Sequence, residues 1–147
     1  MPTGDRTDPY AAFNFTIEID GVTAAGFNEA SGLDTENDII EYRNGDRADS
    51  AVTKLAGLNK YPNIVLKRGF TQDDSLWKWR KQVMDGKTVR QAGAIVLHNE
   101  AREAALRWKF VEGWPSKLQG PALNGKNNEV AIETLEIAHE GLEFEVV

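Results

Sequence analysis

Alternating apolar and polar residues indicate β-strands over much of the first half of the chain. Residues 13–20 alternate strictly, which is the period of a strand with one face in a core, and the apolar positions are Phe13, Phe15, Ile17 and Ile19. Asp20-Gly21 is a tight-turn pair, so we expect a hairpin with a return strand over 22–27. A further strand is predicted over 36–43, which makes the first half mainly β-structure.

Residues 46–62 follow neither the period of a strand nor that of a helix. Loops of this length without secondary structure are uncommon in compact domains, and they usually serve a function. We therefore expect a projecting loop in this segment. The alternative is a poorly ordered surface insertion.

One amphipathic helix is predicted near the middle of the chain. From Asp74 to Met84 the apolar residues fall near helical spacing, and Gly86 is a natural stop. The helix carries Trp77 and Trp79 beside basic residues, an arrangement that would also suit base stacking and phosphate binding. Tryptophans at helical spacing are far more often core anchors, so we expect both to pack into the core.

Further strands are predicted on both sides of this helix, over 63–70, 89–98 and 105–111. The segment 129–139 is ambiguous, because its apolar residues lie at even-numbered positions in the first half and at odd-numbered positions in the second half. It is either a strand with a bulge near Thr134 or a helix, and local propensity slightly favours the helix. Residues 142–146 alternate cleanly and predict a last strand that pairs with the domain or with another chain.

The charge is separated along the chain. The formal net charge is −6 and the pI is about 5.0, which argues against general affinity for nucleic acid. Residues 60–110 carry eleven Lys and Arg against five Asp and Glu, whereas residues 129–147 carry six Glu and no Lys or Arg. This separation suits self-association between unlike faces; the alternative is solvated acidic and basic faces within one monomer.

No enzymatic chemistry is indicated by the residues present. The chain has no Cys, which removes disulfides, thiolate catalysis and Cys-ligated zinc. Neither His98 nor His139 stands in a catalytic-triad or metal-ligand spacing, and no P-loop or dinucleotide glycine motif occurs. We therefore expect no catalytic residue, no cofactor and no metal.

No targeting segment is recognisable either. The first residues lack the basic start and apolar run of a secretory signal, and no run of about eighteen apolar residues occurs. The expectation is a protein made in the cytoplasm without a signal peptide and without membrane insertion of its own.

Several sequence segments, in their order and spacing, carry a family resemblance. They are Phe15-Thr-Ile-Glu-Ile-Asp-Gly21, Ala25-Gly-Phe-Asn-Glu-Ala-Ser-Gly-Leu33, Ile40-Glu-Tyr-Arg-Asn-Gly45, Leu55-Ala-Gly-Leu58, Val65-Leu-Lys-Arg-Gly69, Leu76-Trp77 and Asn128-Glu-Val-Ala-Ile-Glu-Thr-Leu-Glu-Ile-Ala-His-Glu-Gly-Leu142. Together they resemble the contractile-tail tube proteins of phages, a family shared with phage-tail-like injection particles. The resemblance runs from about Tyr10 to the C-terminus.

The resemblance implies the fold and the assembly. The fold would be mainly β (α+β), a small antiparallel β-barrel or sandwich with one flanking helix, in which 129–139 is a strand. An N-terminal arm, 1–12, would precede a single tube-protein domain, 13–147, with the projecting loop at about 46–62. Copies would form hexameric rings that stack into a hollow tube for cargo or DNA, inside a contractile sheath.

The resemblance also implies contact residues and partners. The partners would be further copies of the chain, a sheath protein, baseplate or spike and terminator proteins, and cargo or DNA in the lumen. The expected subunit contacts lie in the projecting loop and in the acidic end, at Leu55, Gly57, Leu58, Lys60, Tyr61, Glu140, Glu143 and Glu145.

Two other functions remain open at this point. The haemolysin-coregulated tube protein of type VI secretion would share the fold and the ring but act partly as a secreted carrier. A carbohydrate-binding β domain is the alternative from another class, because four Trp occur in an acidic, β-rich chain. The sequence segments quoted above favour the phage-tail branch.

Overall fold

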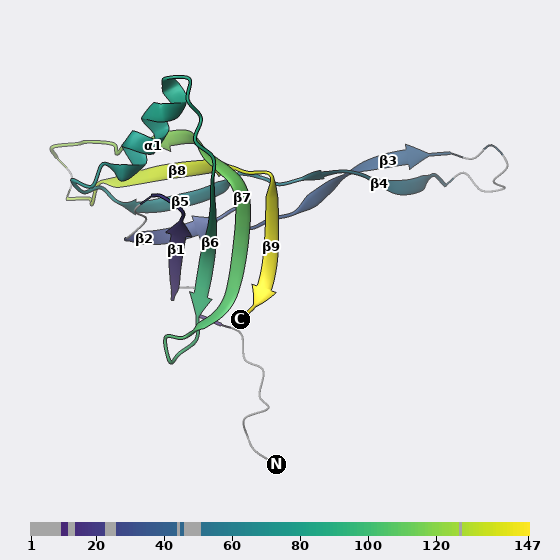
Figure 1. Ribbon diagram of the computed structural model, residues 1–147, viewed down its shortest axis with the longest axis horizontal. Coiled ribbons are helices and arrows are strands. Elements are labelled where there is room, and N and C mark those ends of the chain that lie inside the picture. Colours follow the sequence, from purple (N-terminus) through teal and green to yellow (C-terminus); the bar gives the residue numbers. More distant parts are fainter. Residues whose placement is uncertain (1–9, 12–13, 23–25, 44, 46–50, 127) are drawn as a thin grey trace, which may run out of the picture.

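The computed structural model describes residues 10–11, 14–22, 26–43, 45, 51–126 and 128–147, and within them the chain is an antiparallel β-protein with one helix (Figure 1). In chain order the elements are β1 (Phe15–Ile19), β2 (Phe27–Ser31), β3 (Glu36–Tyr42), β4 (Thr53–Lys60), β5 (Ile64–Gly69), α1 (Ser75–Met84), β6 (Gln91–His98), β7 (Ala104–Gln119), β8 (Ile132–Ala138) and β9 (Gly141–Val146). The expected fold class, mainly β with one flanking helix, is confirmed.

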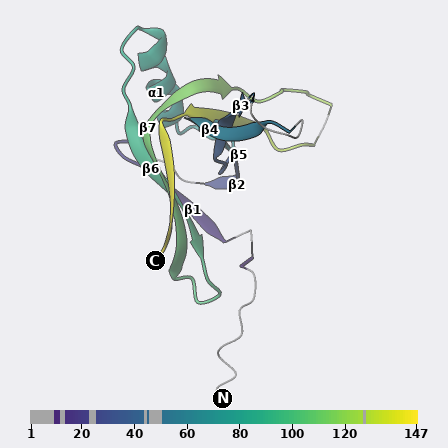
Figure 2. The same ribbon diagram turned by 90° about the vertical axis from the view of Figure 1, so that its right-hand side faces the viewer.

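The long strand β7 belongs to two sheets. Its first half pairs with β6 and β9, and β6 pairs with β1; we call these four strands the β9 sheet. Its second half pairs with β8, which continues through β5 to β2; we call these the β8 sheet. Figures 1 and 2 show the strands of the two sheets running crosswise. Between the halves β7 turns at Glu112, which has a φ of 53°, a left-handed conformation that non-glycine residues rarely adopt.

The core lies between the two sheets and under α1. It consists of apolar residues from β1, β5, α1, β6, β7 and β8: Ile17, Ile19, Ile64, Leu66, Leu76, Trp79, Ile95, Phe110, Leu135 and Ile137. Trp79 also donates a hydrogen bond from Nε1 to the carbonyl oxygen of Val89, 2.9 Å away. Trp77 is more than half exposed, so its prediction as a core anchor is wrong.

Two glycines make room for the Phe110 ring at the bend of β7. A Cβ added at Gly93 would lie 2.5 Å from Phe110 Cζ and 2.5 Å from the carbonyl oxygen of Glu18. A Cβ added at Gly113 would lie 2.7 Å from Phe110 Cε2. These distances are too short for carbon contacts, so both positions need glycine for the two sheets to close over the ring.

A buried ion pair ties the start of α1 to the β8 sheet. Arg68 on β5 donates from Nε to the carboxylate of Glu133 on β8, and both residues are buried. Arg68 also contacts Asp73 just before the helix, with Nη1 lying 3.3 Å from Oδ2 and Nη2 lying 3.2 Å from the backbone oxygen. Hydrogen bonds from Ser75 are the main reason that the pKa of Asp73 lies below its ordinary value, and Arg68 adds to the effect.

The tight turn expected at Asp20-Gly21 is present, and residues 23–25 of the expected return strand lie outside the described residues. Among the described residues, only a single bridge joins Ile19 to Val22, and β1 pairs instead with β6, far along the chain. Strand β2, which begins at Phe27, pairs with β5 and not with β1. Phe13 and residues 1–9 of the expected arm lie outside the described residues.

The expectation of a loop without secondary structure over 46–62 is also wrong. Strand β4 occupies part of it and pairs with β3, forming a two-stranded ribbon that extends from the body of the subunit (Figure 1). Residues 46–50 lie outside the described part. We call β3 and β4 together the ribbon.

The ambiguous segment near the C-terminus is a strand, as the resemblance implied. Strand β8 keeps a regular register with β5, so the helix and the bulge near Thr134 are both wrong. The parity changes because Val130 lies outside the strand and is exposed, while the buried face of β8 consists of Glu133, Leu135 and Ile137. The irregularity lies on β7, between Pro115 and Lys117.

Candidate assembly surfaces

The β9 sheet has two open edges. Strand β9 pairs with β7 along one side, and β1 pairs with β6 along one side; no described residue forms a ladder with the other side of either strand. The two strands lie at opposite sides of the sheet (Figure 1). Unpaired strand edges present rows of free N–H and C=O groups, which are templates for pairing with another chain.

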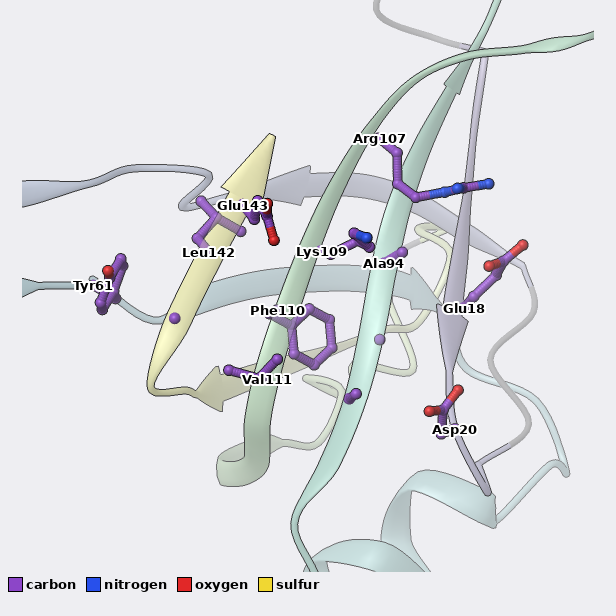
Figure 3. Close-up of a pocket in the computed structure, with 13 residues that line it drawn as sticks. Glu18, Asp20, Tyr61, Ala94, Arg107, Lys109, Phe110, Val111, Leu142 and Glu143 are labelled. Atoms are coloured by element: carbon purple, nitrogen blue, oxygen red, sulfur yellow. The ribbon is translucent and has the colours of Figure 1, made fainter. Parts of the chain in front are cut away.

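One face of the β9 sheet is apolar and the other carries charge. The register aligns Glu18, Ala94, Lys109 and Glu143 across the four strands, and in the next row Thr16, Val96, Arg107 and Glu145. Figure 3 shows Glu18, Lys109 and Glu143 spread across β1, β7 and β9. The first of these rows lines a hollow of about 750 Å³. The opposite face contributes residues such as Ile17 and Ile95 to the core.

The acidic end pairs largely within its own chain. Glu145 lies 2.9 Å from Arg107 Nη1 and 3.1 Å from Lys109 Nζ, and hydrogen bonds from these groups hold the pKa of Glu145 below its ordinary value. Glu140 lies 3.4 Å from Arg90 Nη1. Glu143 makes no ion pair with any described residue. Of the three glutamates expected at a subunit boundary, Glu143 is therefore the one without an ion pair in the described part of the chain.

The ribbon carries exposed apolar side chains on both of its faces. Ile40 pairs with Leu55 in the register and shares a face with it, and these residues are 51% and 48% exposed. Ile39 pairs with Ala56 on the other face and is 65% exposed; Leu58, which is 76% exposed, lies at the register shift of the ribbon. Sequence reasoning singled out Leu55 and Leu58 but missed their neighbours on β3.

The other expected loop contacts have different surroundings. Gly57 lies on the ribbon where an added Cβ would be 3.0 Å from the carbonyl oxygen of Asp38, so close strand approach requires a small residue there. Lys60 Nζ lies 2.6 Å from Asp38 Oδ1, and this hydrogen bond raises the pKa of Lys60. Tyr61 is only partly exposed and packs on the ring of His139, with a centroid distance of 5.7 Å.

The base of the ribbon is fastened beside the start of β9. The buried His139 ring places Nε2 3.2 Å from the carbonyl oxygen of Pro62, and Nδ1 3.0 Å from that of Gly141. The first contact joins the end of the ribbon to the turn between β8 and β9. The ribbon therefore leaves the body at the β9 edge and extends beyond it (Figure 1).

A separate apolar groove lies near the start of α1. It has a volume of about 520 Å³, and Phe70, Trp77, Leu118 and Pro121 supply its apolar lining. Asp73 and Asp74 also line it. The exposed Trp77 thus borders a groove on the surface of the subunit.

Other kinds of site are not found in the described part of the chain. Its His, Asp and Glu residues form no group that would hold a metal ion. None of the helices that the structure describes is long and apolar enough to span a membrane.

Two solved structures similar in fold come from contractile injection systems. A chain of the sheath-tube complex of PVC, an extracellular contractile injection system, in its extended state matches with a TM-score of 0.84 and 25% identity over 95% of this chain and 93% of that one. A chain of the anti-feeding prophage cap, described as the tube terminating cap, matches with a TM-score of 0.86 and 24% identity over 97% and 94%.

Type VI secretion proteins are also similar in fold, but less so. Hcp1 from Flavobacterium johnsoniae matches with a TM-score of 0.56 and 14% identity over 90% of this chain and 94% of that one. The PVC and anti-feeding prophage chains are therefore more similar in fold to this chain than Hcp1 is. A comparison with curated proteins found no match.

A family model assigns most of the chain. The model described as "T4-like virus tail tube protein gp19" matches residues 11–143, which includes β1 to β8, α1 and the start of β9. The open sheet edges and the exposed ribbon are features of a subunit built to assemble. The chain belongs to the gp19 tail tube protein family, and it is a structural tube subunit of a contractile phage tail or an extracellular contractile injection system rather than an enzyme.

Proposed function

We propose that this subunit forms hexameric rings that stack into a hollow inner tube. The observation that carries the proposal is the β9 sheet, which has an open edge on each side, one apolar face in the core and one charged face. If β9 of each copy lies beside β1 of the next, the sheets join into one closed wall, and no edge of these sheets remains in water.

The dimensions of such a wall are reasonable for a channel. Each copy contributes four strands, and neighbouring strands lie about 4.8 Å apart. Six copies then give a circumference of about 115 Å and a backbone diameter of about 37 Å, which strand tilt would increase. Six copies are supported by the anti-feeding prophage baseplate structure, a six-fold symmetrised assembly that contains a similar chain with a TM-score of 0.82.

The charged face of the β9 sheet would line the lumen. Its rows hold the acidic residues Glu18, Glu143 and Glu145 against the basic residues Arg107 and Lys109. A hydrated wall of this kind gives a passing polymer no apolar surface on which to adhere. The lumen would pass cargo or DNA while sheath contraction drives the tube through a target envelope.

Partners follow from the assemblies in which similar chains occur. Those structures are a sheath-tube complex, a tube-terminating cap and a baseplate. We propose that this chain likewise contacts a sheath protein on the outside of the tube and baseplate and terminator proteins at its two ends. The subunit makes and breaks no covalent bond in this mechanism.

Native mass spectrometry and electron microscopy test the ring. The purified chain at high concentration, alone and with the baseplate proteins of its particle, is expected to give hexamers and hollow tubes. Ring formation often needs a nucleating partner, so both conditions are required. A chain that stays monomeric in both would contradict the proposal.

A further inference from the structure

His139 is a buried histidine whose two ring nitrogens both face backbone carbonyl oxygens. It is 8% exposed and lies in the turn between β8 and β9. Its Nδ1 is 3.0 Å from the carbonyl oxygen of Gly141, and its Nε2 is 3.2 Å from that of Pro62. A carbonyl oxygen only accepts hydrogen bonds, so each nitrogen needs a proton to make its contact. A neutral imidazole carries one N–H, and only the imidazolium form carries two.

The neutral His139 ring leaves one of the two contacts unmade in either tautomer. The nitrogen without a proton then points its lone pair at a carbonyl oxygen, and a buried polar group without a partner costs free energy. Turning the ring over places carbon atoms against the carbonyl oxygens and supplies no second donor. The surroundings of His139 therefore match the protonated ring and neither neutral tautomer.

We propose that His139 is a proton-dependent latch between the base of the ribbon and the turn before β9. With both nitrogens protonated, the ring donates to Pro62 and to Gly141 and holds the two segments together. When the ring loses one proton, one of these hydrogen bonds is lost, and the base of the ribbon is free to move relative to β9. The latch lies within one subunit and does not depend on the proposed ring of subunits.

The surroundings of the His139 ring also bear on whether it can hold a positive charge. Burial disfavours the charged form, because it removes water from the ring. Two aromatic rings offset part of this cost: the centroid of the His139 ring lies 5.7 Å from that of Tyr61 and 6.1 Å from that of Phe110 (Figure 3). Hydrogen bonds from a charged donor are roughly twice as strong as neutral ones, and the protonated ring makes two of them.

The charged groups on the neighbouring segments do not pair with His139. On the ribbon side Lys60 pairs with Asp38, and in the turn Glu140 lies 3.4 Å from Arg90 Nη1. The remaining titratable groups lie at the bend of β7 or line the hollow that Tyr61, Phe110 and Gly141 border: Glu18, Asp20, Arg107, Lys109, Glu112 and Glu143. Within the described part of the chain no ion pair joins any of them to His139, so the two carbonyl contacts decide the protonation of the ring.

His98, the other histidine of the chain, provides a matched comparison. Its Nε2 lies 3.0 Å from the hydroxyl oxygen of Thr16, and its Nδ1 has no hydrogen-bond partner among the described residues. A hydroxyl group both donates and accepts, so a neutral ring satisfies this contact. Protonation of His98 therefore completes no second hydrogen bond, and this residue should not act as a latch.

NMR of the full chain labelled with ¹⁵N-histidine measures the protonation of the ring. Long-range ¹H–¹⁵N spectra separate a protonated ring nitrogen from a bare one, and His98→Gln assigns the two rings. Spectra are recorded from about pH 5.5 to about pH 8.5, the range in which histidines change charge, and further upward until one proton leaves His139. We expect two protonated nitrogens on His139 at the acidic end, and one bare nitrogen, in a subunit that is still folded, at the alkaline end.

Hydrogen exchange over the same pH range measures the latch itself. After correction for the intrinsic pH dependence of exchange, the amides of residues 60–64 and 139–142 should open about tenfold more often once the proton has left, because one charge-assisted hydrogen bond is lost. His139→Phe keeps a ring and removes both contacts, so its exchange should lack this pH dependence. His98→Gln should keep it. If His139→Phe does not fold, His139→Gln replaces it, since an amide side chain does not titrate.

Three results would overturn the proposal. A bare nitrogen on His139 at every pH at which the subunit is folded would show that the ring never makes both contacts. Equal protection of residues 60–64 and 139–142 before and after the proton leaves would show that the second hydrogen bond holds nothing in place. The same pH dependence of exchange in His139→Phe as in the parent would assign the effect to another group.

Discussion

Removing the carboxylate of Glu133 is expected to destabilise the folded subunit strongly. Glu133 is 6% exposed and accepts a hydrogen bond from Arg68, which is 2% exposed. Breaking a buried ion pair by removing one partner typically costs about 3–5 kcal/mol, because the remaining charge stays buried. Asp73 lies 3.3 Å from the same guanidinium and offsets part of that charge, so we expect about 3 kcal/mol for Glu133→Leu. For a domain of about 150 residues, this lowers Tm by about 6–12 °C.

Thermal and urea unfolding of the monomer measure this effect. The matched control is Glu136→Leu on the same strand, which removes a more exposed pair with Lys117 at 3.7 Å and should cost about 1 kcal/mol or less. Adding Arg68→Met to Glu133→Leu should restore most of the lost stability, because the pair is then replaced by apolar groups. Equal melting temperatures for Glu133→Leu and Glu136→Leu would refute the reasoning.

Three further predictions concern the β9 sheet. Gly93→Ala should lower the Tm of the monomer by several degrees, because the added Cβ would lie 2.5 Å from Phe110 Cζ. An unchanged Tm would show that the two sheets can move apart without loss of stability. Glu145→Gln should be less stable than the parent at pH 7 and equally stable in strong acid. Folding lowers the pKa of Glu145, so its carboxylate stabilises the folded state fully at pH values above the ordinary pKa of 4.5. This stabilisation is lost as the pH falls through the lower pKa of the folded state. Melting temperatures that differ by the same amount at both pH values would contradict this. Glu143→Gln should change the salt dependence of tube assembly and leave monomer melting unchanged, because its carboxylate has no ion pair among the described residues; identical tube lengths at every salt concentration would mark it as a solvated surface group.

The elements that the sequence predicts well are those with one buried face or stripe. Strands β1, β5 and β9 and helix α1 show the expected periodicity because one side of each contributes to the core. The ribbon has no such side. Its strand β4 has apolar residues on both faces, so the alternation that identifies a half-buried strand is absent, and the segment resembled a loop.

Partners far apart in the chain explain the other misses. The turn at Asp20-Gly21 is a correct local signal, but the partner of β1 is β6, about eighty residues away, which no local pattern reveals. The charged Glu133 on the buried face of β8 hid the strand period, because its partner Arg68 is 65 residues distant. Trp77 borders a surface groove although its spacing is that of a core residue.

The assembly surfaces were predicted only in part. Leu55 and Leu58 were singled out as exposed-looking apolar residues in an aperiodic segment, and both are exposed on the ribbon. Ile39 and Ile40 were missed because a strand was expected there, and a strand normally buries its apolar residues. Whether any of these residues contacts another copy stays a prediction.

The arrangement of β9 beside β1 of the next copy is the central claim, and cryo-electron microscopy of tubes assembled on the baseplate tests it most directly. We predict a six-fold hollow tube in which the β9 sheets form one continuous wall, with Glu18, Lys109 and Glu143 facing the lumen. A tube whose subunits leave the β1 and β9 edges unpaired, or whose lumen is lined by another face of the subunit, would contradict the account.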